Sequence, residues 1–154
     1  MKVLSIDPGI ASTGWAFMDT QDGIVYHGQI STPPKLGSKY ERAFSTMMHL
    51  SHLLDSADAV SLEDYNAYRH GGAAANTLVL CGFVWFHVMT ETKANLYVVN
   101  NNHWRAFKRA SKIKVPSTLK EHESDAVWML YSLLKDIGEP IPTQRHYKRK
   151  RLKP

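Results

Sequence analysis

Apolar and polar positions alternate at the start of the chain, and this pattern predicts three short strands. We expect them at Met1–Asp7, Gly14–Asp19 and Ile24–Ile30. Pro8-Gly9 and Asp22-Gly23 mark turns between them, because glycine, proline and aspartate favour the backbone conformations of tight turns. Strands joined by such short turns pair antiparallel, so this part of the chain is predicted to form a meander.

The apolar spacing then changes to a helical period. Apolar residues recur every three to four positions in three segments, so we expect helices at Lys39–Ala57, Ala73–Thr92 and Thr118–Asp136. Ser38 is the expected N-cap of the first helix, and Gly138 is expected to end the last one. The middle helix is apolar on most sides, which predicts that most of its surface is buried.

Two further strands and a short helix fill the remaining segments. Ala59–Glu63 and Leu96–Val99 are short apolar runs, and Asn101 or Asn102 is expected to cap a basic helix before the cationic loop Ser111–Val115. Each of these two strands follows a helical crossover, so it should pair parallel to an earlier strand. The order of elements predicts an α/β fold, in which a mixed five-stranded sheet (an antiparallel meander plus parallel strands) is flanked by helices.

Asp7 and Glu63 end two strands that are expected to be neighbours. By period-two alternation, Ser5 shares a face with Asp7 and Ser61 shares a face with Glu63, so both carboxylates should project at one edge of the sheet. Carboxylates that lie together repel one another unless a positive charge lies between them, and a hard divalent cation commonly supplies it. Such a cluster is typical of enzymes that hydrolyse phosphodiesters.

The last helix adds two side chains that can face the same pocket. His122 and Asp125 are three positions apart, and residues with this spacing are neighbours on a helix surface. An unpaired buried carboxylate is costly, so Asp125 on an apolar face indicates a partner. Taken one at a time, these residues have other interpretations. Asp7 could simply form a turn, Asp64 could be the inward carboxylate in place of Glu63, and His122 could be a structural histidine of the core.

Three motifs, in their order along the chain, resemble the RuvC family of Holliday-junction resolvases. They are Ser5-Ile6-Asp7-Pro8-Gly9 with Thr13-Gly14, then Leu62-Glu63, then His122-Glu123-Ser124-Asp125-Ala126. The resemblance spans most of the chain and suggests a compact, phage-type member. It implies an RNase H-like fold, a homodimer, two Mg²⁺ or Mn²⁺ ions per active site, and paired symmetric nicks near the branch point of a four-way DNA junction.

The resemblance also implies roles for individual residues. Asp7, Glu63 and Asp125 correspond to metal-binding catalytic acids, and His122 matches a fourth position that the family fills with an acid or a histidine. The family commonly places an aromatic residue after the second acid, where it stacks at the opened junction. Tyr65 or Tyr68 could serve here, and the sequence does not choose between them.

Basic residues provide a surface for DNA. The segment from residue 92 to residue 120 contains seven basic side chains and no acidic one. We expect five of them to hold backbone phosphates beside the acids: Arg105, Lys108, Arg109, Lys112 and Lys114. Trp104 borders this patch and is expected to be packed in the core rather than stacked on a base.

The net charge of +5 is concentrated at the C-terminal end. The last ten residues hold six basic side chains, whereas the rest of the chain holds 13 basic and 14 acidic ones. We therefore expect a nuclease domain at residues 1–140 and a basic tail at residues 141–154. The tail is predicted to be mobile and to tether DNA electrostatically.

Composition restricts the compartment. The single Cys81 excludes an internal disulfide and a cysteine-based zinc site, and it favours a reducing environment. No apolar run is long enough to cross a bilayer, and no targeting signal is evident. We expect a cytoplasmic protein of a bacterium or a phage-infected cell, with no membrane and no small-molecule substrate.

The expected function is a junction endonuclease that also cuts forks and flaps, and two other functions remain open. One is a catalytically silent junction-binding module, which the complete acidic set disfavours. Another is an RNase H-type nuclease that cuts the RNA of a hybrid, which the motif around His122 and Asp125 disfavours. The exposed face of the middle helix, near Phe83, Trp85 and Phe86, is the candidate dimer interface, and the alternative is that these side chains are core.

Overall fold

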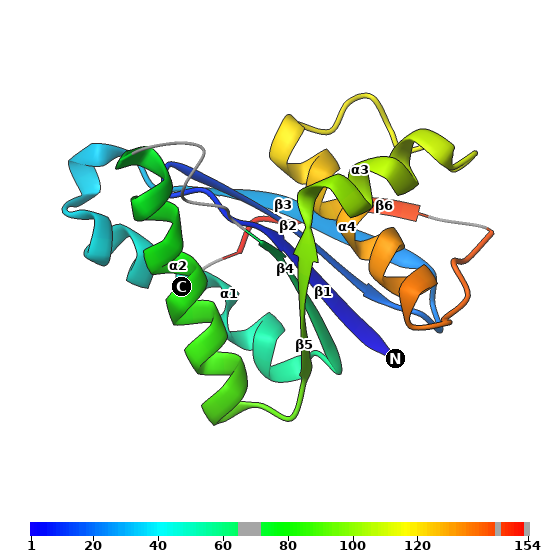
Figure 1. The fold of residues 1–154 in the computed structure, drawn as a ribbon, viewed down its shortest axis with the longest axis horizontal. Coiled ribbons are helices and arrows are strands. Elements are labelled where there is room, and N and C mark those ends of the chain that lie inside the picture. Colours follow the sequence, from blue (N-terminus) through cyan, green and yellow to red (C-terminus); the bar gives the residue numbers. More distant parts are fainter. Residues whose placement is uncertain (65–71, 144–145, 153–154) are drawn as a thin grey trace.

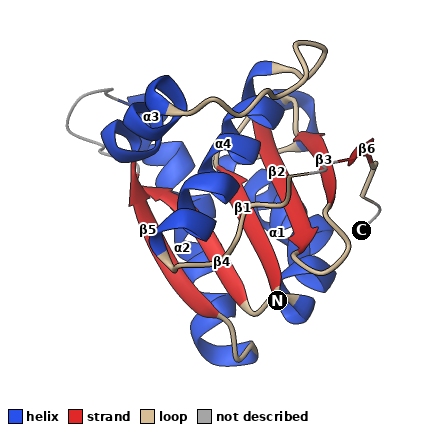
Figure 2. Ribbon diagram, turned by 90° about the vertical axis from the view of Figure 1, so that its right-hand side faces the viewer, coloured by secondary structure: helices blue, strands red, loops and turns tan. Residues whose placement is uncertain are grey.

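The computed structural model describes residues 1–64, 72–143 and 146–152, which form one twisted sheet with helices on both faces (Figure 1, Figure 2). The strands are β1 (Lys2–Asp7), β2 (Ser12–Asp19), β3 (Ile24–Ser31), β4 (Ala59–Asp64), β5 (Asn95–Asn100) and β6 (His146–Arg149). The helices are α1 (Lys39–Ser56), α2 (Gly72–Glu91), α3 (Asn101–Ala110) and α4 (Glu121–Asp136), with a 3-10 turn η1 (Pro34–Leu36). Every predicted helix and strand is present, which confirms the α/β fold class.

In the described part of the chain, the sheet has six strands in the order β5-β4-β1-β2-β3-β6. The strands β1, β2 and β3 form the predicted antiparallel meander, and β4 and β5 add in parallel, as their helical crossovers predict. The prediction of five strands is wrong by one, because β6 pairs in parallel with β3. Residues 146–149 therefore form an edge strand in the segment that the sequence predicts to be a mobile tail. Tyr147 is the only apolar residue of β6, so no alternation of apolar positions marks it as a strand.

Side chains of the sheet alternate between two helical layers. Leu4 and Ile6 of β1 face α1 and α2 and belong to the core on that side. Ser5 and Asp7 point the other way, toward α4, and the Ser5 hydroxyl donates to the carbonyl oxygen of Ala126 in that helix. The acidic end of β1 is therefore on the face that α3 and α4 cover.

Side-chain caps fix the starts of α1 and α3. The predicted cap of α1 is confirmed, because Ser38 and Glu41 form a capping box: the Ser38 N–H donates to Glu41 Oε2 at 2.7 Å, and the Glu41 N–H donates to Ser38 Oγ at 3.4 Å. The cap of α3 is one residue earlier than predicted. The side chain of Asn100, rather than that of Asn101 or Asn102, accepts a backbone N–H of the first turn, at 2.8 Å.

The ends of α4 matter because this helix carries two of the candidate residues. The helix begins at Glu121, three residues later than predicted, where the Glu123 carboxylate accepts the N–H of Lys120 at 3.3 Å. It ends at Asp136, as predicted, and Gly138 follows with a φ of +76°, a conformation that favours glycine. His122 therefore lies in the first turn of α4.

In the part of α2 whose burial is described, residues 77–91, one face packs against the rest of the protein, so the prediction that most of this helix is buried is wrong. Leu80, Val84 and Val88 are buried in the core, whereas Trp85 is 51% exposed and Phe86 is 60% exposed. Apolar residues occupy both faces of the helix, and the sequence pattern alone does not tell them apart. Within the described residues, no helix has both the length and the apolar character that a membrane span requires.

Candidate active site

Two carboxylates project side by side where β1 and β4 end. These strands pair in parallel with Ser5 opposite Ser61, so Asp7 and Glu63 follow in register on the same face, as the alternation predicts. Both acids are nearly buried, with Asp7 7% and Glu63 8% exposed. Asp64 is exposed, and alternation places it on the opposite face. Of the two, Glu63 is the buried, inward-facing group.

Glu63 is difficult to ionise in this environment. Burial raises the pKa of Glu63 to about 7, and the charge of Asp7 contributes to the increase. A hydrogen bond from Trp104 Nε1 to Glu63 Oε1, at 3.3 Å, lowers this pKa, as does the charge of Arg105. Two close carboxylates without enough positive charge between them form a site that attracts a cation.

His122 contacts Asp7 directly from the start of α4. Its Nδ1 and Asp7 Oδ2 share a hydrogen bond of 2.5 Å, and this bond is the main reason why the pKa of His122 is raised, against the effect of burial. The close approach of α4 to β2 depends on Gly14, because a β-carbon at that position would collide with the backbone carbonyl of His122. The glycine of the first motif therefore allows α4 to place its imidazole against the acid of the same motif.

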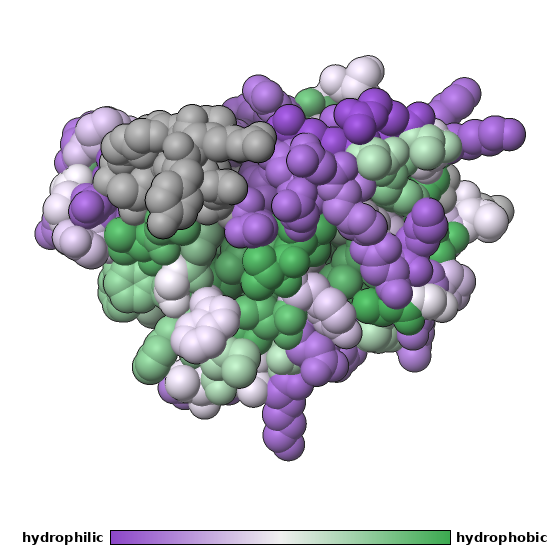
Figure 3. All heavy atoms as spheres, in the orientation of Figure 1, coloured by the Kyte–Doolittle hydropathy of each residue, from purple (hydrophilic) through white to green (hydrophobic). Residues whose placement is uncertain are grey.

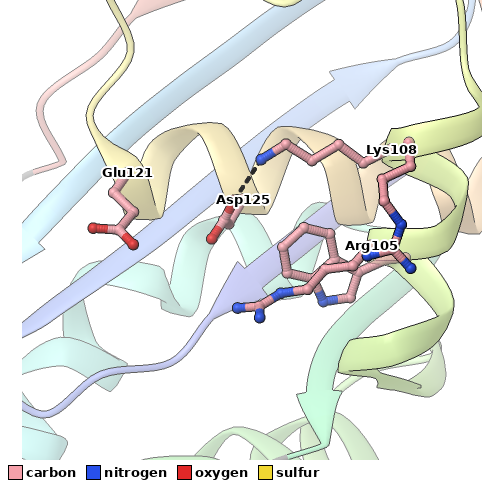
Figure 4. A pocket seen from close by; sticks show the side chains of 6 residues that line it. Arg105, Lys108, Glu121 and Asp125 are labelled. Atoms are coloured by element: carbon pink, nitrogen blue, oxygen red, sulfur yellow. Dashed lines mark hydrogen bonds and ion pairs between the residues drawn. The ribbon is translucent and has the colours of Figure 1, made fainter.

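Asp125 is held by a cation from the neighbouring helix. Lys108 Nζ of α3 lies 3.2 Å from Asp125 Oδ1, and Figure 4 shows the two side chains reaching toward each other between α3 and α4. Burial raises the pKa of Asp125, Lys108 opposes this increase, and the charge of Asp7 adds to it. Asp7 thus interacts electrostatically with both Glu63 and Asp125, which makes the three acids one candidate site.

The donor set suits a hard divalent cation. Carboxylate oxygens with one imidazole are ligands that Mg²⁺ and Mn²⁺ accept. Among the described residues, no three histidine, cysteine or acidic groups are arranged closely enough to hold an ion. Instead, His122 contacts Asp7 and Lys108 contacts Asp125, and in each pair the basic side chain offsets the charge of the carboxylate. A bound cation would compete with His122 for Asp7 and with Lys108 for Asp125. The chemistry of the residues fits a divalent metal, but their side chains would have to move to coordinate one.

A cavity of about 330 Å³ lies between α3 and α4, beside Asp125. Its lining residues are Trp104, Arg105, Lys108, Arg109, Glu121 and Asp125. Three of the five predicted phosphate-binding cations are therefore at the acidic site. The other two, Lys112 and Lys114, are exposed in the loop that follows α3. The predicted Tyr65 and Tyr68 lie outside the described residues.

Two contacts of the acids are not evident from the sequence. Trp104 is buried, as predicted, but its hydrogen bond to Glu63 is not predictable from its position, and neither is the ion pair of Lys108 with Asp125. The spacing of four residues places Trp104 and Lys108 on one face of α3. That spacing is the available signal, and only the packing of α3 against α4 shows that this face is turned toward the acids.

The environment of Glu63 predicts how stability depends on pH when no metal is bound. Because the folded protein holds a proton on Glu63 up to about pH 7 and the unfolded chain loses it near the ordinary value of 4.5, this group favours unfolding increasingly as the pH rises between those values. Glu63→Gln should therefore raise the free energy of unfolding in EDTA at pH 8 by about 1–3 kcal/mol, with almost no gain at pH 4.

Urea denaturation of both proteins across this pH range measures the difference. Asp64→Asn is the matched control, because it removes the adjacent exposed carboxylate and should change the free energy of unfolding by less than about 0.5 kcal/mol. A Glu63→Gln gain that is the same at pH 4 and pH 8 would contradict the raised pKa.

Comparison with known proteins identifies the fold. No protein-family model and no curated protein matches the sequence. Among solved structures, "T. thermophilus RuvC in complex with Holliday junction substrate" matches with a TM-score of 0.71 and 17% identity, over 90% of this chain and 96% of that one. "Thermus thermophilus RuvC structure" matches with a TM-score of 0.66 and 19% identity, over 90% and 97% of the two chains. The chain therefore has the fold of these two RuvC structures, which confirms the predicted RNase H-like fold.

Proposed function

We propose that the chain is a metal-dependent, structure-selective DNA endonuclease that resolves four-way junctions by paired symmetric nicks in the cytoplasm. Forks and flaps are secondary substrates of the same site. The observation that carries the proposal is the convergence of Asp7, Glu63 and Asp125 from two strand ends and a helix, with His122 on Asp7. The likeness to a RuvC structure in complex with a Holliday junction substrate supports the choice of DNA.

Asp7, Glu63, Asp125 and His122 are the residues that would hold two Mg²⁺ or Mn²⁺ ions. Such ions, when bound, activate water and neutralise charge on the departing 3′ oxygen. The protein's own groups prepare the site: Trp104 orients Glu63 through its indole N–H, and His122 orients the attacking water or accepts its proton. Lys108, once freed from Asp125, is placed to meet a phosphate beside the acids.

The cations of α3 and the following loop would bind the DNA backbone. Arg105, Lys108 and Arg109 line the cavity next to Asp125, and exposed Lys112 and Lys114 extend the charge beyond it. Contacts to phosphates provide affinity and orientation without reading the base sequence. Tyr65 or Tyr68 is the proposed residue that stacks on a base at the opened junction.

Paired nicks at symmetric positions require two active sites, and we propose that a homodimer supplies them. The candidate interface is the exposed apolar face over α2 and β5 (Figure 3), where Trp85, Phe86, Met89 and Val98 are each more than half exposed. Exposed apolar surface of this kind is typical of protein–protein interfaces. Sedimentation equilibrium should give twice the chain mass of 17.5 kDa.

Cleavage of a synthetic immobile four-way junction tests the proposal. We expect symmetric paired nicks with Mg²⁺ or Mn²⁺, none in EDTA, and no cleavage of a linear duplex with the same sequence. Tight junction binding without metal-dependent nicks would indicate the silent binding module instead. Faster cleavage of an RNA–DNA hybrid than of the junction would indicate an RNase H-type nuclease.

A further inference from the structure

A second cationic surface lies outside the candidate active site. It is a groove of about 650 Å³ between β3, α1 and the C-terminal segment, here called the C-terminal groove. Its polar and charged lining comes from Gln29, His49, Lys120, Arg149, Lys150 and Arg151. None of its described lining residues is acidic, so the groove combines a concave shape with a strongly positive potential.

The C-terminal segment is fixed to the sheet on both sides of these cations. The strand β6 pairs with β3, and the Lys150 N–H donates to the His27 carbonyl oxygen at 2.8 Å. Two residues later, Leu152 is buried in the core on the α1 side of the sheet. Lys150 and Arg151 therefore extend from a backbone that is held at both ends, which lowers the entropic cost of ordering them against a ligand.

A buried carboxylate accounts for only one of the cations. Arg149 Nη2 lies 2.7 Å from Oε1 of Glu123, a side chain that is 1% exposed. This ion pair anchors β6 to the first turn of α4. The charges of Lys120, Lys150 and Arg151 have no acidic partner among the described residues that line the groove. Lys150 Nζ lies over the ring of Tyr26, 5.9 Å from its centroid, a contact that leaves its charge unneutralised and able to meet an external anion.

The C-terminal groove adjoins the candidate active site. Lys120 lines the groove, and the next residue, Glu121, lines the cavity beside Asp125. Both surfaces thus meet at the start of α4, whereas the cations of α3 lie on the other side of that cavity. Figure 2 shows α3 and β6 toward opposite edges of the sheet, with α4 between them. Positive charge therefore flanks the acids on two sides.

We propose that the C-terminal groove binds the sugar-phosphate backbone of a DNA arm that extends from the active site. The proposal rests on the proposed function, because it takes the cleaved strand to lie at Asp7, Glu63 and Asp125. The groove and the α3 patch then hold the DNA on either side of the scissile phosphate. The contacts are to phosphates, so they contribute affinity and orientation and no base preference.

The test compares two neutralised proteins with the same loss of charge. The groove variant is Lys150→Gln with Arg151→Gln, and the control is Lys2→Gln with Lys93→Gln. Both control residues are exposed: Lys2 begins β1 at the end away from Asp7, and Lys93 lies two residues before β5. Junction binding is measured in EDTA at several salt concentrations. Since each lost phosphate contact lowers the slope of log K against log[salt] by about 0.9, the groove variant should lose about 1–2 in slope and bind about tenfold more weakly at low salt.

A second variant and a footprint sharpen the result. Lys120→Gln, which lies at the start of α4 rather than in the C-terminal segment, should also weaken binding. In the groove variant, hydroxyl-radical protection should be lost on the arm that extends from each of the two active sites of the proposed homodimer, while protection at the branch point stays. Equal weakening of the groove variant and the control, or no weakening, would overturn the proposal. If the wild-type protein never nicks a junction but the groove variants still bind DNA more weakly than the control, the endonuclease assignment fails and the groove stands.

Discussion

Replacing Asp7 by asparagine should reduce metal-dependent nicking of a four-way junction by about a thousandfold or more, while junction affinity in EDTA stays within about twofold. Asp7 is the acid that interacts with both Glu63 and Asp125, so the substitution removes the negative charge that is central to the proposed metal site. Asparagine keeps the size of the side chain and its ability to hydrogen-bond with His122. Binding should persist because the cations of α3 are untouched.

The same variant should stay close to the wild-type protein in stability. Removing the charge of Asp7 relieves repulsion on Glu63, which offsets the weaker hydrogen bond to His122, so the free energy of unfolding in EDTA should change by less than about 1 kcal/mol. Asp64→Asn is the matched control and should nick normally. An Asp7→Asn protein that still nicks at a tenth of the wild-type rate would rule out Asp7 as a metal ligand, and one that fails to bind the junction would give the residue a binding role.

The second large effect concerns Glu123, which is not part of the acidic site. Glu123→Ala should lower the free energy of unfolding by about 2–4 kcal/mol in urea denaturation. The substitution removes the partner of Arg149 and of buried His27, whose Nδ1 lies 3.6 Å from Glu123 Oε2, and it also removes the acceptor for the Lys120 N–H. Because Arg149 can reach water after its partner is lost, the effect should be smaller than for a fully enclosed pair.

A matched control separates this buried carboxylate from a surface one on the same helix. Asp136→Asn removes an exposed pair with His103 and should change the free energy of unfolding by less than about 0.5 kcal/mol. Arg149→Gln should destabilise the protein by a similar amount to Glu123→Ala, because it leaves the Glu123 charge buried without its partner. If Glu123→Ala matched Asp136→Asn, the anchor of β6 would lie elsewhere.

Most of the fold follows from two periodicities in the sequence. Alternation in β1 and β4 predicts which face carries Asp7 and Glu63, because a strand that slipped by one residue would turn these acids toward α1 and α2 and its apolar set toward α4. Helical spacing finds α1, α2 and α4. The strand β6 is not predictable in this way, because it is a short edge strand whose pairing depends on β3, far away in the sequence. Edge strands need no apolar pattern when one of their faces lies in water.

The candidate site is predictable as a set of residues but not as an arrangement. The motifs bring Asp7, Glu63, His122 and Asp125 together, and the structure places them at one end of the sheet. The pairing of Asp125 with Lys108 depends on the angle at which α3 packs on α4, and local sequence does not encode that angle. Tertiary packing alone also decides that Trp85 and Phe86 face outward from α2.

The pairing of β6 with β3 has a consequence for how the chain folds. Because Ile24 is paired with His146, this contact closes a loop that contains every helix together with β4 and β5, and such non-local contacts form late and slowly. Until they form, β3 presents an open edge with unpaired backbone groups, which favours association between unfinished molecules. The ion pair of Glu123 with Arg149 then holds β6 on this edge. Conditions that weaken the ion pair should therefore promote aggregation during refolding before they destabilise the folded protein.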